Sequence, residues 1–335
     1  PAVPIIGGIA CISLAIFQGL AVPSAGMIAV VWLSIGGILF LSLFARLARL
    51  KDVSSVAANP ELVRLRGNTP LVLVPIANPQ NAEPMIVLAE TLVPSEVGRV
   101  LIQTIVVAPE KWDLESNPDP IHRSQEVLHA SLSASTRLGV PVETLTTVSP
   151  HPMEEIARVA RLHRCESVLL GLSEITEDRD GTPLERLLGV LTTDVVVLRA
   201  TEHWKLEESE TILVPVAGRG GHDYLLARLL GSLTRKQRGR VKFFRVVPSS
   251  TSTSELRRVR RDLDRIAREN IGRESESEVV LSDDPIESLI EAANQCGLLI
   301  MGVQRIGPRQ KLFGEFTRQI AKRTTCRLII ISRRG

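Results

Sequence analysis

The stretch LVLVPIANP (71–79) is an apolar run that ends abruptly at polar residues, and ILVPVAGR (212–219) repeats it about 140 residues later. Each run has the length and branched apolar content of a buried parallel strand. In both copies the residue after the strand is alanine, at Ala77 and Ala217. The repeat predicts a duplicated α/β unit, and the alanines raise the question of whether either copy retains a ligand site.

From residue 69 onward, short apolar runs alternate with amphipathic segments, which is the pattern of a parallel sheet covered by helices. In the first copy we predict strands near 71–76, 100–107, 142–148, 167–171 and 195–198, and helices near 82–92, 121–138, 153–163 and 183–191. In the second copy we predict strands near 211–216, 241–247, 277–281, 298–301 and 328–331, and helices near 222–234, 254–271, 286–296 and 311–322. The predicted fold class is α/β, with parallel-sheet domains at 69–200 and 211–335 and a linker at 201–210.

Local matches support the duplication. They are RCESVLLGL (164–172) with QCGLLIMGV (295–303), SPHPMEEI (149–156) with SDDPIESL (282–289), and TTDVVVL (192–198) with TTCRLIII (324–331). In the second of these pairs, Asp284, Pro285 and Glu287 predict an N-cap, a first-turn proline and an N3 glutamate. His151, at the same place in the first copy, is interpreted as a cap rather than a catalytic base.

This order of elements resembles the universal stress protein family, in tandem, over about residues 69–335. In that family the first strand ends in an Asp near the adenine and ribose, and a Gly-x2-Gly-x9-Gly-Ser/Thr loop after the fourth strand cradles phosphates. Glycines let backbone N–H groups approach the anion, and the following helix N-terminus adds positive potential. The resemblance also implies that the last strands of the copies meet, so we expect Val195–Arg199 and Leu328–Ser332 to pair within the chain.

The first copy departs from that family pattern at every point. Ala77 and Asn78 stand in place of the strand-end Asp, and Gly189 is followed by Val190 rather than Ser or Thr. The loop LSEITEDRDG (172–181) places four carboxylates where a triphosphate would bind, at Glu174, Glu177, Asp178 and Asp180. Like charges repel strongly in a partly dry site, so we predict that this copy does not bind ATP.

The second copy keeps a basic loop, GVQRIGPRQKLFGEF (302–316), although Glu315 stands in the Ser/Thr zone. Its candidate nucleotide- or anion-binding residues are Gly218, Gly302, Arg305, Gly307, Arg309, Lys311, Gly314 and Thr317. One interpretation is that this loop binds an adenine nucleotide, as a cofactor, with altered geometry. The alternative is a solvated basic loop that packs against a partner or the membrane.

The first 45 residues contain no Asp, Glu, Lys, Arg or His. Residues 3–22 and 25–44 are each long and apolar enough to cross a bilayer, and Pro23 and Ser24 suit a turn between them. This pattern predicts a transmembrane helical hairpin. A signal peptide is disfavoured because there is no basic n-region and a second apolar segment follows at once. A buried soluble hairpin is disfavoured because soluble core helices rarely lack charge at both ends.

The predicted hairpin is followed by a basic juxtamembrane linker at 46–68, in which Arg46, Arg49 and Lys51 would face the membrane surface. The positive-inside rule places this end in the cytoplasm. We therefore expect an integral protein of the inner (plasma) membrane of a prokaryote, with residues 46–335 cytoplasmic.

The segment PAVPIIGGIACISLAIF (1–17) resembles the penultimate span of the amino acid–polyamine–organocation permeases, and the second span with its basic exit resembles their last span. This resemblance implies upstream transmembrane helices that the sequence lacks. The hypothesis is the C-terminal portion of a secondary transporter, for amino acids, with a cytosolic regulatory module. The alternatives are a membrane-anchored adenine-nucleotide sensor and the tail of a cation or chloride transporter.

Other chemistry has little support in the sequence. The cysteines and histidines are scattered without metal-ligand spacing, and no Ser/His/Asp or Cys/His group stands out, so we expect no metal and no enzyme. The basic segment ELRRVRRDLDRIARENIGR (255–273) has an apolar stripe at helical spacing, typical of a surface helix. TRKQRGRVKFF (234–244) is better suited to anionic lipids than to nucleic acid, because aromatic residues make up only 3% of the chain. A homodimer through the α/β domains is a further expectation.

Overall fold

The computed structural model describes residues 23–39, 70–94, 97–109, 118–172, 187, 189–200, 211–216, 224–236, 240–271, 275–304 and 315–333. The chain divides into two compact units, Pro1–Lys51 and Asp52–Gly335.

In the first unit the structure describes a single element, the helix α2 (Pro23–Leu39), which has 17 residues. Its apolar side chains include Met27, Ile28 and Trp32, and all three are exposed. Within the described part of the chain, no helix has both the length and the apolar character needed to cross a bilayer. The predicted span at 3–22 and the basic residues Arg46, Arg49 and Lys51 lie outside the described residues.

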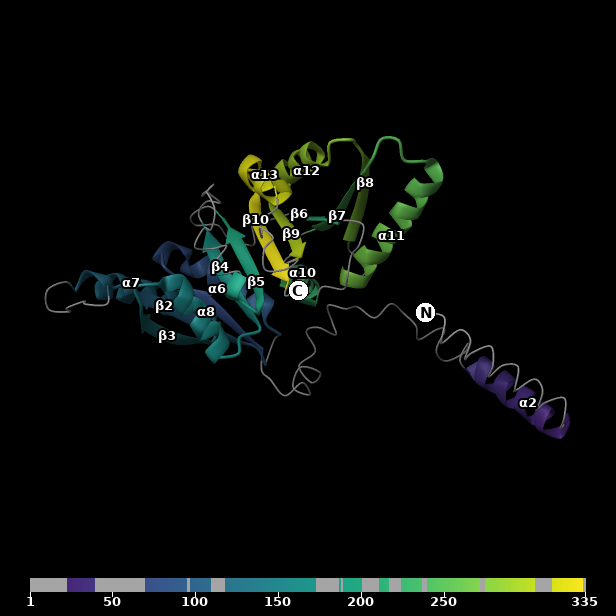
Figure 1. Cartoon of the computed structure of the whole chain (residues 1–335), viewed down its shortest axis with the longest axis horizontal. Coiled ribbons are helices and arrows are strands. Elements are labelled where there is room, and N and C mark those ends of the chain that lie inside the picture. Colours follow the sequence, from purple (N-terminus) through teal and green to yellow (C-terminus); the bar gives the residue numbers. More distant parts are fainter. Residues whose placement is uncertain are drawn as a thin grey trace. The chain divides into compact units, whose positions relative to one another are not determined.

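In the second unit the described residues form a ten-stranded sheet with the order β3-β2-β1-β4-β5-β10-β9-β6-β7-β8 (Figure 1). The strands of the first copy are β1 (Leu71–Pro75), β2 (Arg99–Val106), β3 (Val142–Val148), β4 (Ser167–Leu172) and β5 (Asp194–Arg199). Those of the second copy are β6 (Thr211–Pro215), β7 (Arg240–Val247), β8 (Ser275–Leu281), β9 (Leu298–Gln304) and β10 (Arg327–Arg333). The predicted α/β class with two parallel-sheet halves is confirmed, because the strands within each copy pair in parallel.

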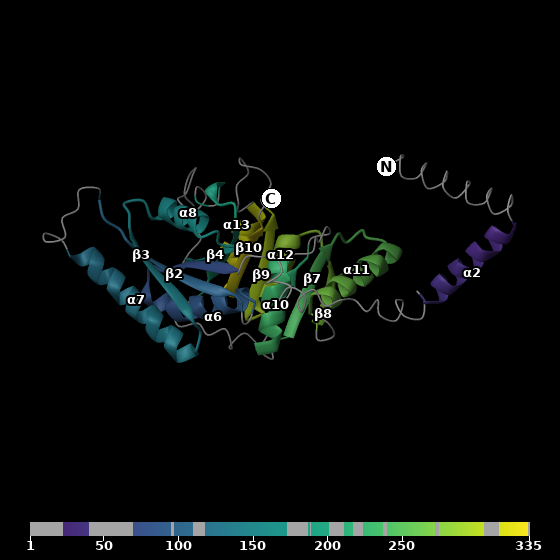
Figure 2. The same ribbon diagram turned by 90° about the horizontal axis from the view of Figure 1, so that it is seen from below.

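Helices cover both faces of the sheet (Figure 2). On one face lie α6 (Ala82–Leu92), α7 (Asp119–Leu138), α10 (Tyr224–Lys236) and α11 (Thr253–Ile271), whose buried side chains share one core cluster. On the other lie α8 (Pro152–Leu162), α12 (Pro285–Asn294) and α13 (Glu315–Arg323), which share a second cluster. A short 3-10 helix, η2 (Pro79–Asn81), precedes α6. Both clusters contain residues of both copies, so burial of apolar surface holds the copies together.

The junction of the copies is an antiparallel pairing of β5 with β10, and this confirms the predicted contact between the last strands. The register pairs Leu328 with Arg199 and Ser332 with Val195. Val197 pairs with Ile330, and each occupies the fourth position of its strand. The register therefore has the symmetry of a two-fold axis that passes between Val197 and Ile330.

Arg199 also links the copies, because its guanidinium reaches from the end of β5 to the turn between α13 and β10. It donates to the carbonyl of Ala321, to that of Thr324 at 3.0 Å and to that of Cys326 at 2.6 Å. These carbonyls lie at or just beyond the end of α13, where backbone acceptors lack helical partners and a cation is favoured. Burial lowers the pKa of Arg199, but guanidinium remains charged at neutral pH.

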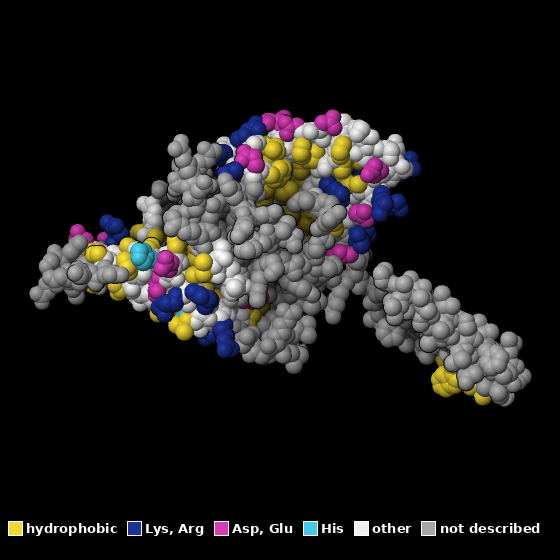
Figure 3. All heavy atoms as spheres, viewed as in Figure 1, with side chains coloured by type: hydrophobic (Ala, Val, Ile, Leu, Met, Phe, Trp, Pro, Cys, Tyr) yellow, Lys and Arg dark blue, Asp and Glu magenta, His cyan; other side chains and the backbone are white. Residues whose placement is uncertain are grey.

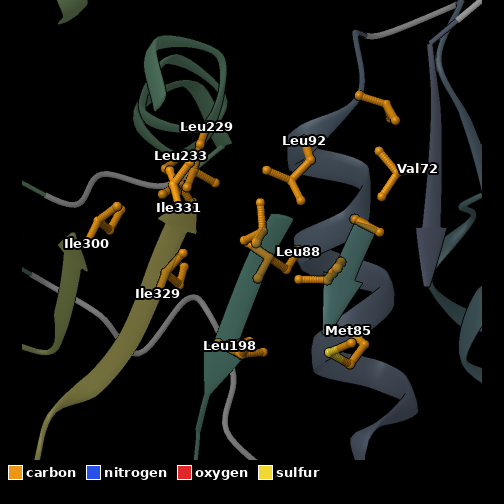
Figure 4. Packing of buried hydrophobic residues seen from close by; sticks show 14 of the residues in the cluster. Val72, Met85, Leu88, Leu92, Leu198, Leu229, Leu233, Ile300, Ile329 and Ile331 are labelled. Carbon is orange, nitrogen blue, oxygen red and sulfur yellow. The ribbon is translucent and has the colours of Figure 1, made fainter. Parts of the chain in front are cut away.

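The helices α6 and α10 pack beside each other on the face that Figure 4 shows. Leu229 and Leu233 of α10 lie over Ile331 of β10, and Leu88 and Leu92 belong to α6. All five side chains are 0% or 1% exposed. The core thus continues across the junction rather than ending at it.

Both predicted cap residues occupy the N-cap of a helix, but only one of them caps through its side chain. Asp284 caps α12 as predicted, with its Oδ1 accepting from the backbone N–H groups of Ile286 at 3.1 Å and Glu287 at 3.0 Å. Glu287 binds Arg323 of α13 at 2.5 Å. His151 occupies the N-cap of α8, but its side chain forms no capping hydrogen bond. Its backbone N–H instead donates to the hydroxyl of Ser149 at 3.1 Å, so His151 is a cap by position and not through its side chain.

Candidate functional site

The carboxyl end of β1 is where the resemblance to the universal stress proteins implies a nucleotide-binding carboxylate. Ala77 is exposed there. Asn78 caps η2, with its side-chain oxygen accepting from the N–H of Gln80 at 3.0 Å. An Asn oxygen used in this way stabilises a turn. In the first copy, therefore, the side chain after the strand serves local structure and leaves no carboxylate for a ribose.

The glycines near the ends of β4 and β9 have different surroundings in the two copies. A Cβ at Gly171 would lie 3.1 Å from the Sδ of Met85, a residue of α6 that is only 1% exposed. A Cβ at Gly302 would meet no described atom within 4 Å. The side chain of Met85 thus occupies the space over the first-copy glycine, whereas among the described atoms the space over Gly302 is open.

The candidate binding residues of the second copy divide into two groups. Gly302 lies inside β9, paired with Ile331, rather than in the loop that follows the strand, because the ladder with β10 continues to Gln304. Thr317 lies in the first turn of α13 and is 5% exposed. The remaining candidates lie outside the described residues: Gly218, Arg305, Gly307, Arg309, Lys311 and Gly314.

The N-terminus of α13 carries an acidic side chain, Glu315. Its carboxylate accepts from Gln319 at 3.0 Å and from Arg318 at 2.5 Å. Hydrogen bonds from Gln319 and then Arg318 lower the pKa of Glu315, which favours its charged form. A carboxylate at a helix N-terminus takes the position that an anionic ligand would use.

A buried polar chain in the first copy was not predicted from the sequence. Gln103 of β2 is 0% exposed and donates from its Nε2 to the hydroxyl of Thr147 in β3 at 3.3 Å. Thr147 is hydrogen-bonded in turn to the carboxylate of Glu155 in α8. Arg158 binds that carboxylate with two contacts of 2.7 Å, from Nε and Nη2. Comparing the two copies in the sequence could have revealed this chain. The second copy has Phe244, Val280 and Ser288 at the positions of Gln103, Thr147 and Glu155, so the polar residues are particular to the first copy.

This polar chain predicts an acid-dependent contribution to stability. The hydrogen bonds from Arg158, its positive charge and the hydrogen bond from Thr147 lower the pKa of Glu155 against the opposing effect of burial. A lowered carboxyl pKa stabilises the fold above the unfolded-state pKa of about 4.3, and that contribution is lost as pH falls through the folded-state pKa. We expect Glu155→Gln to reduce the loss of unfolding free energy between about pH 5 and pH 3. Urea unfolding of both proteins across this range measures it, and parallel curves would contradict it.

Among the described residues, neither the cysteines nor a group of metal-ligating side chains forms a catalytic or metal site. Cys165, Cys296 and Cys326 are free thiols, and burial raises the pKa of all three, that of Cys165 to about 11. Such thiols are poor nucleophiles at neutral pH. Within the described ranges, no group of three or more His, Cys, Asp or Glu side chains could hold a metal ion.

The ten-stranded sheet and its two helix layers have a fold similar to that of universal stress proteins. A universal stress protein from Archaeoglobus fulgidus DSM 4304 superimposes with a TM-score of 0.56 at 15% identity, covering 80% of this chain and 100% of that one. One from Pseudomonas aeruginosa UCBPP-PA14 gives 0.52 at 14% identity, covering 79% and 93%. The cytoplasmic domain of a prokaryotic cation chloride cotransporter gives 0.50 at 14% identity, covering 80% and 97%.

These likenesses establish the fold. No protein-family model matches the sequence. No curated protein matches it either.

Proposed function

We propose that this chain is the C-terminal portion of a membrane secondary transporter, with amino acids as its substrate class, in which the tandem α/β unit is a regulatory module. The observation that carries the proposal is the likeness of the tandem unit to a transporter's cytoplasmic domain, over 80% of this chain and 97% of that one. The uncharged first 45 residues support it, because two apolar segments of bilayer-spanning length precede the unit. The first copy has an acidic loop at 172–181 and no Asp after its first strand, so we propose that it regulates by contacting another protein surface and not by binding ATP.

A membrane-extraction experiment tests the membrane part of this proposal. The full chain, expressed in bacteria, should stay with the membrane pellet after alkaline carbonate washing, because apolar segments of this length partition into the bilayer. Residues 52–335 alone serve as the matched control and should be released. Release of both proteins would contradict membrane integration. A protease-accessible C-terminus in inside-out vesicles, and a protected one in right-side-out vesicles, would support the proposed cytoplasmic location.

The second candidate function is an adenine-nucleotide sensor that uses the second copy. Among the described atoms, the space over Gly302 is open and that over Gly171 is occupied by Met85, and this difference favours the sensor. If it is correct, titration of ATP into residues 52–335 gives saturable binding, and Gly302→Val weakens this binding about tenfold or more by filling the space that the ligand needs.

Gly171→Ala is the matched control in the first copy and should leave ATP affinity unchanged. If isothermal titration calorimetry shows no saturable binding of ATP up to millimolar concentration, the sensor hypothesis is contradicted. Equal losses from both glycine variants would place the ligand elsewhere.

A homodimer remains part of the proposal, with a constraint from the fold. The strands that meet in pairs of related domains, β5 and β10, already pair with each other in this chain. The outer strands β3 and β8 carry glutamates that form ion pairs, Glu143 with Arg99 at 3.1 Å and Glu276 with Arg240 at 3.9 Å. Charged side chains on edge strands discourage strand addition. A dimer would therefore use a helical face.

A further inference from the structure

The helix α11 (Thr253–Ile271) carries an unusually dense group of arginines on its solvent side. We name this group the α11 arginine face, and it consists of Arg257, Arg258, Arg260, Arg261, Arg265 and Arg268. All six are exposed, whereas Val259, Leu263 and Ala267 are buried against the sheet. Helical spacing of about 100° per residue places Arg261 and Arg265 nearly opposite that buried stripe, with Arg258 and Arg268 beside them. Figure 3 shows dark-blue side chains along this edge of the unit, with some acidic ones among them.

The fold uses this arrangement only in part, since Arg261 and Arg268 donate from Nε to the backbone carbonyls of Arg257 at 3.3 Å and Asp264 at 3.1 Å. Like charges three and four residues apart on a helix repel each other, as Arg257 does Arg260 and Arg261. Cations are favoured in the last turn of a helix, whereas this group starts one turn from the N-terminus. Among the described ion pairs, α11 contributes Arg265 with Asp262 at 3.5 Å. The carboxylate of Asp264 accepts a hydrogen bond from the hydroxyl of Ser277 in β8, so this acidic side chain contacts the sheet.

The first copy provides an internal comparison. Its equivalent helix, α7 (Asp119–Leu138), has two arginines, Arg123 and Arg137, and Arg137 binds Glu83 of α6 at 2.6 Å. Both helices pack on the same face of the sheet. The buried residues of α11 are all apolar, whereas those of α7 include three serines, and neither helix buries an arginine. Packing against the sheet therefore does not account for the additional arginines of α11.

We infer that the α11 arginine face binds an anionic phospholipid surface. The inference rests on the proposed function, since the uncharged first 45 residues would hold the unit beside a bilayer. A row of exposed cations suits lipid headgroups, which bind through summed charge. Recognition of single-stranded nucleic acid would need stacking side chains, and the aromatic residues of the adjacent strand, Phe243 and Phe244, are 1% and 3% exposed.

Vesicle co-sedimentation of residues 52–335 tests the inference. This segment contains the whole described sheet and both core clusters, so it has the interior of an independent folding unit. It should bind phosphatidylcholine vesicles that contain phosphatidylserine, not those without it, and release in about 1 M salt, where the Debye length is about 3 Å. Each well-placed cation strengthens such binding about fivefold, so R257Q/R261Q should weaken it at least about tenfold.

The matched control is R123Q/R137Q, which removes the same charge from α7 and should leave vesicle binding almost unchanged. Equal loss from both double variants, or no binding of the wild-type unit to phosphatidylserine vesicles at low salt, overturns the inference. Tighter, arginine-dependent binding to single-stranded DNA than to these vesicles also overturns it. Carbonate extraction of the full chain tests membrane integration separately from lipid binding by the α11 arginine face. If the full chain stays in the membrane pellet but residues 52–335 do not bind phosphatidylserine vesicles, only the lipid-binding inference is contradicted.

Discussion

Replacing Arg199 with methionine will lower the unfolding free energy of residues 52–335 by about 3 kcal/mol, because buried carbonyls lose a charged donor that methionine cannot replace. The acceptors at Ala321 and Cys326 belong to residues that are 3% and 6% exposed, so water would not readily replace the guanidinium. Arg199→Lys should cost less, since one ammonium still reaches some of the acceptors, although it lacks the planar fork. Urea denaturation measures the loss.

Arg137→Met is the control for this experiment. Its ion pair with Glu83 is exposed on both sides, at 64% and 41%, and exposed pairs are worth about 0–1 kcal/mol. If the two methionine variants lose the same stability, Arg199 does not hold the junction. A loss for Arg199→Met accompanied by early cleavage near the linker at 201–210 would show that the copies separate before they unfold.

Replacing Ile330 with aspartate should have the larger effect, about 4 kcal/mol or more, because it puts an unpaired carboxylate at the centre of the β5–β10 junction. Ile330 is 1% exposed, and its partner across the junction, Val197, is 1% exposed. Burial should also raise the pKa of the new carboxyl, so the variant should recover part of its stability as the pH falls through that pKa.

Val148→Asp is the matched control on an outer strand, since Val148 of β3 is 61% exposed and the change should cost about 0.5 kcal/mol or less. Thermal unfolding of both variants, followed by circular dichroism, measures the difference. A soluble, stable I330D protein with native melting would show that β5 and β10 are not joined in solution.

The sequence predicted helices, strands and caps well where the spacing of residues close together in the chain determines them. The Asp284–Pro285 cap was readable because the capping side chain and its N–H donors are adjacent in the chain. The helix at 82–92 and the strand at 142–148 have the predicted bounds. The β5–β10 contact was predictable because the resemblance to the universal stress proteins implied a symmetric meeting of the last strands.

Features that depend on distant neighbours were not predictable from local pattern. The strand β9 extends to Gln304 rather than ending at 301, because β10 supplies partners as far as Arg333. The position of Met85 over Gly171 depends on how α6 lies on the sheet, which no local pattern specifies. The chain of Gln103, Thr147 and Glu155 brings together three elements whose separate sequences read as ordinary strand and helix surface.

Uptake of a radiolabelled amino acid by proteoliposomes tests the central claim most directly. The intact gene product should be compared with a form truncated before Asp52, at matched protein content. If the tandem unit regulates a transporter, removal of residues 52–335 changes the uptake rate, or its dependence on anionic lipid, several-fold while the protein remains in the membrane. Identical uptake with and without the unit, or no uptake by a correctly inserted intact protein, would contradict the claim.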